Sequence, residues 1–202
     1  MKKLFVLLFL VLLAGCKETK KENSEIELSE KEVFKNDNLS KEYMDKGMDY
    51  ALSTKAVLGK NLMGTIQKNG TLAALQFCNI RAYSLTDSMA TVHQATIKRV
   101  SDKPRNIINM ANEEELGYID TYKKTVSEGK DVTPIVVQKN DKVNFYYPII
   151  TNAMCLQCHG KPDKEIKPEI LAALKELYPK DMAQGYDVGQ VRGVWSISFK
   201  KK

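Results

Sequence analysis

One short stretch, Cys155-Leu156-Gln157-Cys158-His159-Gly160, constrains this chain more than any other. Two cysteines separated by two residues and followed directly by a histidine form the spacing that attaches a c-type haem. Each thiol adds across one vinyl group of the porphyrin, and the two intervening residues let both sulfurs reach one edge of the macrocycle. The adjacent histidine then supplies the proximal imidazole to the iron. We therefore expect Cys155 and Cys158 to hold one covalent haem c, with His159 as its proximal ligand.

Three other interpretations of the cysteine pair are weaker. A zinc site needs about four ligands in a tetrahedral array, and no second Cys or His pair follows at the spacing of a zinc finger or ribbon. A thioredoxin-type motif needs a preceding strand and a helix that opens at the motif, and it does not require the histidine. A disulfide across two residues is strained and uncommon.

The N-terminus predicts export to the cell envelope. Two lysines precede an apolar run over 4–13, which is shorter than a membrane-spanning helix. The run ends in Leu-Ala-Gly-Cys16, typical of a bacterial lipobox, whose cysteine is lipidated and becomes the mature N-terminus. We therefore expect residues 1–16 to be a lipoprotein signal peptide, an ordinary cleaved signal peptide being the alternative. Export agrees with the haem motif because c-type haem is attached outside the cytoplasmic membrane, so the domain should face the periplasm or the outside.

The remaining chain divides into a tether and one domain. Residues 17–38 are mainly Lys, Glu, Asn and Ser, and such a stretch buries too little apolar surface to offset its ordering entropy. Residues 39–202 are expected to form the globular domain, since 43% of the whole chain is hydrophobic and 28% charged. The net charge is +6, but basic and acidic residues are interspersed, so no nucleic-acid partner is expected.

Helical periodicity dominates the first part of this domain. Ser40 is a candidate N-cap for a long first helix. Gly70 is suited to the positive φ that ends such a helix. Thr71 would then cap a second helix that runs to roughly Met89, with Cys78 on its inner, apolar face.

The second part of the domain has the pattern of a small sheet with helices between its strands. Alternating apolar residues predict strands, and turn residues separate them. The predicted elements are a strand over 94–100, a helix from Asn112 to Ser127, a hairpin that turns at Asn140-Asp141 and whose second strand ends at Pro148, a helix over 168–177, a loop over 181–193, and a final half-buried strand with Trp195, Ile197 and Phe199 on one face and Ser196 and Ser198 on the other.

Cys78 and His93 compete for the second axial position on the iron. With Cys16 assigned to lipid and the motif thiols to haem, Cys78 is the cysteine left without a role. A thiol on an apolar helical face often acts simply as a small hydrophobic group. His93 falls one turn beyond Met89 and is the rival ligand, and spacing alone leaves the choice open.

The loop after the first predicted strand brings three basic residues together. Haem carries two propionates, and the guanidinium of arginine matches a carboxylate bidentately. Arg99 and Arg105 are therefore candidate propionate ligands, whereas solvated surface charge is the preferred interpretation of Lys103.

Taken together, these features resemble a family of exported PAS-like haem c domains, which occur as sensory modules and as free-standing proteins. The resemblance covers roughly residues 39–199. It implies an α+β fold, with a PAS-like central antiparallel sheet, long N-terminal helices and flanking helices, and iron held between His159 and a distal cysteine, here Cys78. The stretches that carry it are Ala74-Leu75-Gln76-Phe77-Cys78, Lys98-Arg99-Val100-Ser101 with Arg105-Asn106, the haem motif itself, and Tyr178-Pro179-Lys180-Asp181 with Ala183, Gly185-Tyr186, Gly189 and Arg192-Gly193.

Two functions follow as expectations. The first is a redox or diatomic-gas sensing module, because an iron–thiolate bond weakens on reduction and so provides two states. The alternative is a membrane-anchored monohaem electron-transfer cytochrome. An enzyme is not expected, because two axial ligands leave no open distal side. The expected partners are haem, the membrane through the lipid anchor, and a redox or signalling protein that the sequence does not identify.

Overall fold

The computed structural model describes residues 37–200. The expected signal peptide, Cys16 and nearly all of the expected tether lie outside the described residues. The described elements are, in chain order, α1 (Asp37–His93), β1 (Thr96–Val100), a short 3-10 helix η1 (Ile107–Asn109), α2 (Glu113–Ser127), β2 (Ile135–Lys139), β3 (Lys142–Ile150), α3 (Ala153–His159), α4 (Pro168–Leu177) and β4 (Val191–Lys200). The strands form one antiparallel sheet in the order β1-β4-β3-β2, so the predicted α+β fold is confirmed.

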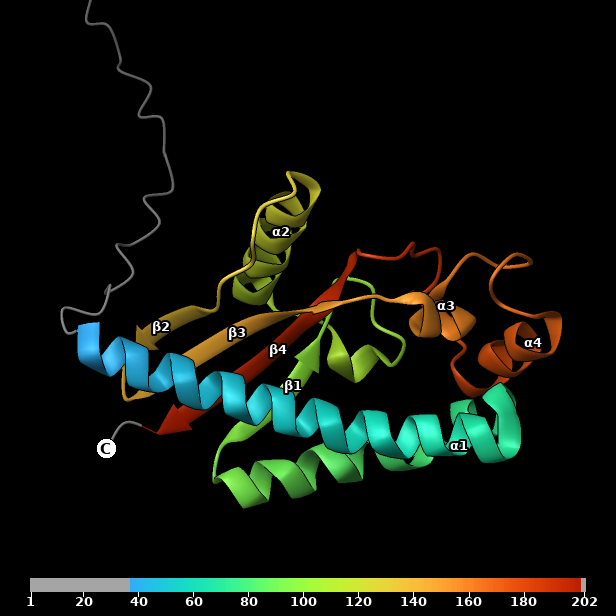
Figure 1. Cartoon of the computed structure of the whole chain (residues 1–202), viewed down its shortest axis with the longest axis horizontal. Helices are drawn as coiled ribbons and strands as arrows, with labels where there is room; N and C mark the ends of the chain where they lie inside the picture. The colour runs from blue at the N-terminus through green and yellow to red at the C-terminus, as the bar shows by residue number, and fades with distance from the viewer. Residues whose placement is uncertain (1–36, 201–202) are drawn as a thin grey trace, which may run out of the picture. The chain divides into compact units, whose positions relative to one another are not determined.

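Helix α1 is a helical hairpin that turns at Gly70. This glycine has φ 81° and ψ 175°, a backbone conformation essentially confined to glycine. The first half (37–69) therefore ends where the sequence predicted, and the second half (71–93) runs back beside it (Figure 1). Within the described residues, no helix is both long and apolar enough to cross a bilayer.

The predicted start of this helix was wrong. Ser40 lies inside α1, which already includes Asp37. The helix extends because Leu39 and Tyr43 pack on the sheet, where the ring of Tyr43 lies 5.2 Å from that of Phe199. Burial of these side chains offsets the entropy of ordering the extra turn.

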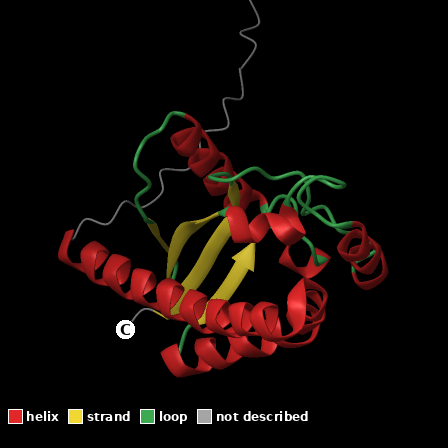
Figure 2. Ribbon diagram, turned by 45° about the vertical axis from the view of Figure 1, so that its right-hand side comes forward, coloured by secondary structure: helices red, strands yellow, loops and turns green. Residues whose placement is uncertain are grey.

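The two faces of the sheet carry different helices. Because neighbouring residues of a strand point to opposite faces, Phe145 packs among residues of α1 and Tyr146 among residues of α2. Figure 2 shows α1 lying across the strands, with α2 and the loops gathered toward the other side. The sheet is thus the central layer, covered on both faces.

This double cover corrects the expectation of a half-buried final strand. Strand β4 lies between β1 and β3, and Ser196 is buried although it lies on the polar face of the sequence pattern. Its hydroxyl donates to Glu115 Oε1 of α2 at 2.8 Å. The other oxygen of Glu115 accepts from the backbone N–H of Asn112, which is the N-cap of this helix. The Ser196 hydroxyl and the Glu115 carboxylate therefore lie together under α2, and each provides a hydrogen-bond partner for the other buried group.

The end of β3 also differs from the sequence expectation. The strand continues through Pro148 to Ile150. Strand β2 pairs with β3 only as far as Tyr146, so one edge of β3 is open at the proline. A missing N–H is tolerated at an unpaired edge, and the strand thereby reaches almost to the haem motif.

Replacement of Glu115 by alanine is predicted to lower the free energy of unfolding by about 2–3 kcal/mol, because it removes the side-chain acceptor for the Asn112 N–H in the capping box and leaves the Ser196 hydroxyl buried without an acceptor. Glu113→Ala is the matched control, since it removes an exposed acidic residue from the same helical turn and should cost less than about 1 kcal/mol. Urea denaturation of both variants measures the difference. Equal losses would show that the buried contact contributes nothing.

Candidate functional site

The Cys-x-x-Cys-His motif forms its own short helix, α3, to which the sequence analysis had assigned no structure. Asn152 caps the helix, since its side-chain oxygen accepts from the backbone N–H of Cys155 at 3.2 Å and from the Cys155 thiol at 3.3 Å. A helix places positions i and i+3 on adjacent parts of one face, so the two motif cysteines lie near each other. Cys78, Cys155 and Cys158 are all free thiols.

Gly160 ends the motif at a point of close packing. A Cβ atom there would lie 2.6 Å from Glu165 Cβ and 2.7 Å from the carbonyl oxygen of Leu156. The close approach lets the turn that contains Glu165 fold against the end of the motif. The chain after α4 also runs alongside this end, where Gly185 N–H donates to the Gly160 carbonyl at 2.8 Å and Tyr186 N–H donates to the His159 carbonyl at 3.0 Å.

The imidazole of His159 is held in one tautomer. Its Nδ1 lies 2.8 Å from the carbonyl oxygen of Ala183, which can only accept a hydrogen bond. Nδ1 therefore carries the proton, and Arg192 Nε, 3.4 Å away, does not donate to it. Burial, followed by the positive charges of Arg105 and Arg192, lowers the pKa of His159 well below its usual value. The ring is thus neutral, with the lone pair of Nε2 available for a metal.

The second half of α1 brings Cys78 to the motif. Thr71 donates from its hydroxyl to Gln157 Oε1 at 2.7 Å, and Leu75 packs in one apolar cluster with Cys158 and α4. Cys78 follows Leu75 by three residues and so lies on the same side of the helix. Burial raises the pKa of the Cys78 thiol, and the nearby Cys158 raises it further. The motif and Cys78 therefore face a common space.

His93, the rival ligand, lies elsewhere. Its ring stacks on that of Tyr50 at 4.0 Å, and its Nε2 lies 2.8 Å from Ser53 Oγ on the first half of α1. Fifteen helical positions separate it from Cys78, about 22 Å along the axis. The structure brings Cys78 to the motif and does not bring His93 there.

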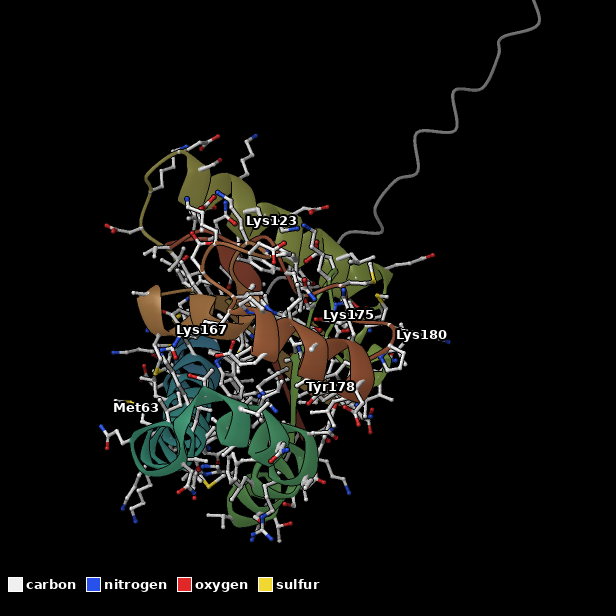
Figure 3. The ribbon with its side chains drawn as sticks, turned by 90° about the vertical axis from the view of Figure 1, so that its right-hand side faces the viewer. Met63, Lys123, Lys167, Lys175, Tyr178 and Lys180 are labelled. Atoms are coloured by element: carbon white, nitrogen blue, oxygen red, sulfur yellow. The ribbon has the colours of Figure 1, made fainter. Side chains whose placement is uncertain are left out.

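Arg99 lies beside the same space. Burial lowers its pKa, whereas the neighbouring groups Cys78, Tyr83 and Tyr178 act in the opposite direction. Across residues 37–200 its guanidinium has no carboxylate partner. Figure 3 shows Tyr178 just after α4, on the side of that helix toward α1. The cation therefore has no neutralising partner of its own and could bind an acidic group.

A cavity of about 360 Å³ opens next to Arg99. It lies between the second half of α1, β1, η1 and the start of α2. Tyr83 and Arg99 line it together with apolar residues of the η1 region, including Ile108 and Met110. Ile108 is 68% exposed, so part of the apolar surface near Arg99 is uncovered.

Arg105 donates hydrogen bonds to other residues of the chain through two of its three side-chain nitrogens. Its Nε donates to Asp181 Oδ1 at 3.3 Å, and its Nη2 donates to the carbonyls of Ala183, at 3.3 Å, and of Cys158. The ion pair with Asp181 is buried, the side chains being 11% and 4% exposed. Arg105 thus ties the motif to the loop after α4, and only Nη1 remains for the propionate role expected from the sequence.

Three residues of this arrangement had no role in the sequence analysis. Asp181 pairs with Arg105, Ala183 orients His159, and Arg192 lies against its ring. All three fall in the stretches that carry the family resemblance, which was the available signal. Their roles depend on the way the loop folds back on α3.

The donor set suits a haem better than a bare metal ion. Within residues 37–200, no group of three or more His, Cys, Asp and Glu side chains is arranged to hold a metal. Haem supplies its own four equatorial nitrogens, so one free imidazole nitrogen and one thiol suffice as axial ligands. The two motif thiols are also free to react. The residues present therefore fit the group.

Comparisons with known proteins agree with this fold. A family model described as Tll0287-like matches residues 19–200. The crystal structure of the cyanobacterial heme-protein Tll0287 is similar to the chain with a TM-score of 0.58 and 17% sequence identity, over 77% of this chain and 95% of that chain. At that identity the likeness shows the fold alone. No curated protein matches the chain.

Proposed function

The chain belongs to the Tll0287-like family, and from this premise we propose that it is a c-type haem protein with a His/Cys-ligated iron that acts as a redox or diatomic-gas sensing module. Cys155 and Cys158 would hold the haem covalently, and His159 and Cys78 would be its axial ligands. Export and lipid anchoring through Cys16, with the domain in the cell envelope, are part of the proposal. So are a membrane, a redox or signalling partner, and the absence of catalytic turnover.

One observation carries the proposal most strongly. The Nδ1 of His159 bonds to the Ala183 carbonyl, so Nε2 is left as a free ligand in the same short helix as two free thiols. A metal-bound histidine characteristically donates its other ring N–H to a carbonyl or carboxylate. The similar solved structure is that of a heme-protein, which supports the same assignment.

Attachment needs only the two motif thiols and the two vinyl groups. Each S–H adds across one C=C bond, so that a C–S bond forms and the hydrogen passes to the other vinyl carbon. No oxidant or leaving group is required, and the protein gains the full mass of one haem. The half-buried positions of Cys155 and Cys158 keep both thiols accessible for this step.

The sensing role rests on Cys78. Bound haem would supply a redox-active iron at this point of the structure. Burial alone raises the pKa of the Cys78 thiol, but the charge of a metal ion favours the thiolate. A thiolate donates electron density and so stabilises ferric over ferrous iron. Reduction would weaken the bond to Cys78, and the helix that carries it could then take a second position.

Electron transfer is the second candidate, and the exposure of the motif favours it. Asn152 and Ala153 are exposed and Cys155 is half-buried, so a group attached to its thiol lies near the surface. A carrier must keep both axial ligands in both redox states.

Carbon monoxide separates these two functions. If the protein is a sensor, the reduced form is expected to bind the gas with a clear shift of the Soret band, because the bond to Cys78 has weakened. An electron carrier with a tight six-coordinate ferrous centre should ignore it. Titration of dithionite-reduced protein under increasing carbon monoxide provides the measurement.

Expression with haem-ligation machinery tests the haem itself. The wild-type chain should gain the mass of one haem and show c-type absorption bands. In the Cys155→Ala/Cys158→Ala variant the covalent mass should be lost completely. His93→Ala should keep it, because that ring packs on Tyr50 away from the motif. Colourless wild-type protein of unmodified mass would refute the proposal.

The distal ligand has its own matched pair of variants. Cys78→Ala should change the ferric visible spectrum and the electron paramagnetic resonance g values, because it removes the proposed thiolate. His93→Ala should leave both unchanged. The opposite pattern would make His93 the ligand and would require a rearrangement of α1.

A further inference from the structure

Two arginines lie close enough to His159 for their charges to act on its ring, and they differ in whether they have an ion-pair partner. Arg105 is paired with the buried carboxylate of Asp181. Arg192 comes from β4, and its Nε lies 3.4 Å from His159 Nδ1. In the described part of the chain no carboxylate lies within ion-pair distance of Arg192. The charge of Asp181 also acts on Arg192, but two arginines and one carboxylate leave one net positive charge near the imidazole.

Arg192 is nevertheless firmly held. Its Nη1 donates to Ser101 Oγ at 2.8 Å, and the same hydroxyl donates to the Arg192 carbonyl at 2.7 Å. Its guanidinium also lies 5.4 Å from the ring centre of Tyr186, whose ring is nearly perpendicular to that of His159. These neutral partners fix the position of the cation without cancelling its charge. Burial lowers the pKa of Arg192, but a guanidinium stays charged at neutral pH.

Such a cation favours one redox state of the proposed centre. With the porphyrin and one thiolate counted, ferric iron leaves the centre neutral and ferrous iron leaves it with a negative charge. A fixed positive charge at the proximal ligand therefore stabilises the reduced form. This effect opposes the thiolate of Cys78, which stabilises the oxidised form.

We propose that Arg192 is a positioning residue that acts on the iron through His159 and raises the reduction potential of the iron. The Cys78 thiolate acts in the opposite direction and lowers that potential. The inference rests on the proposed function, because it needs a haem bound at His159. It assigns the two arginines different tasks. Arg105 ties the motif to the 181–183 loop, and Arg192 supplies charge.

Redox titration of the intact haem protein tests this role. Arg192→Gln removes the charge, and its amide can still bond to Ser101. The ferrous-to-ferric ratio at a fixed ambient potential should fall about tenfold, equivalent to about 59 mV for a one-electron couple. Arg192→Lys keeps the charge and should stay within about twofold of wild type. Lys164→Met removes a cation whose side chain is 69% exposed, and solvent screening should leave the ratio unchanged.

Different results would refute the role of Arg192 and the proposed haem function. If Arg192→Gln carries haem with a wild-type ferric spectrum and an unchanged ratio, the inference is wrong and the haem assignment stands. If Arg192→Lys shifts the ratio as far as Arg192→Gln, the effect is not one of charge and the inference is again wrong. Should Arg192→Gln fail to fold, Arg192→Met provides the neutral variant for the same titration. Loss of all covalent haem in the wild-type chain would instead refute the proposed function.

Discussion

The hydrogen bond from His159 Nδ1 to the carbonyl of Ala183 is the interaction on which the site depends. It selects the tautomer and points Nε2 away from the loop, while burial and the positive charges of Arg105 and Arg192 keep the ring neutral. A backbone carbonyl can do this only if the chain around it is rigid. The loop is fixed by Gly185 and Tyr186, which bond to the end of α3, and by Thr151, whose hydroxyl donates to the Asp187 carbonyl. The orientation of one imidazole is thus a property of the whole segment between α4 and β4.

The same segment connects the site to the core. It leads directly into β4, which pairs with both β1 and β3 and is covered by helices on both faces. Ser101, at the end of β1, bonds to the backbone and the side chain of Arg192 on β4. The central strand of the sheet therefore leads straight to the residues that surround His159. The second half of α1, which carries Cys78, reaches the site through Thr71 and Leu75 instead. The two sides of the site are therefore supported independently.

The charged residues of the site also fall into two groups, those with an ion-pair partner and those without one. Arg105 and Asp181 compensate each other, whereas Arg99 and Arg192 have no carboxylate partner within residues 37–200. Arg99 lies toward Cys78 and the cavity beside η1, and Arg192 lies behind His159. A group with acidic substituents bound at this site would therefore meet cations that have no carboxylate partner of their own. Desolvated charges of this kind are costly unless a ligand or a function compensates them.

The sequence by itself determined what depends on neighbouring residues: the Cys-x-x-Cys-His motif, the turn at Gly70, the helix that starts near Asn112, the hairpin at Asn140 and helix α4, each of which follows from spacing or turn chemistry within a few positions. Only the tertiary structure determined which of Cys78 and His93 lies near the motif, because both lie on one helix and the packing of that helix sets which end meets the motif. The tertiary structure also determined that Ser196 is buried and that Arg105 donates hydrogen bonds to backbone carbonyls. These outcomes depend on contacts between residues 50 to 100 positions apart, and no local pattern encodes which distant partner a side chain will meet.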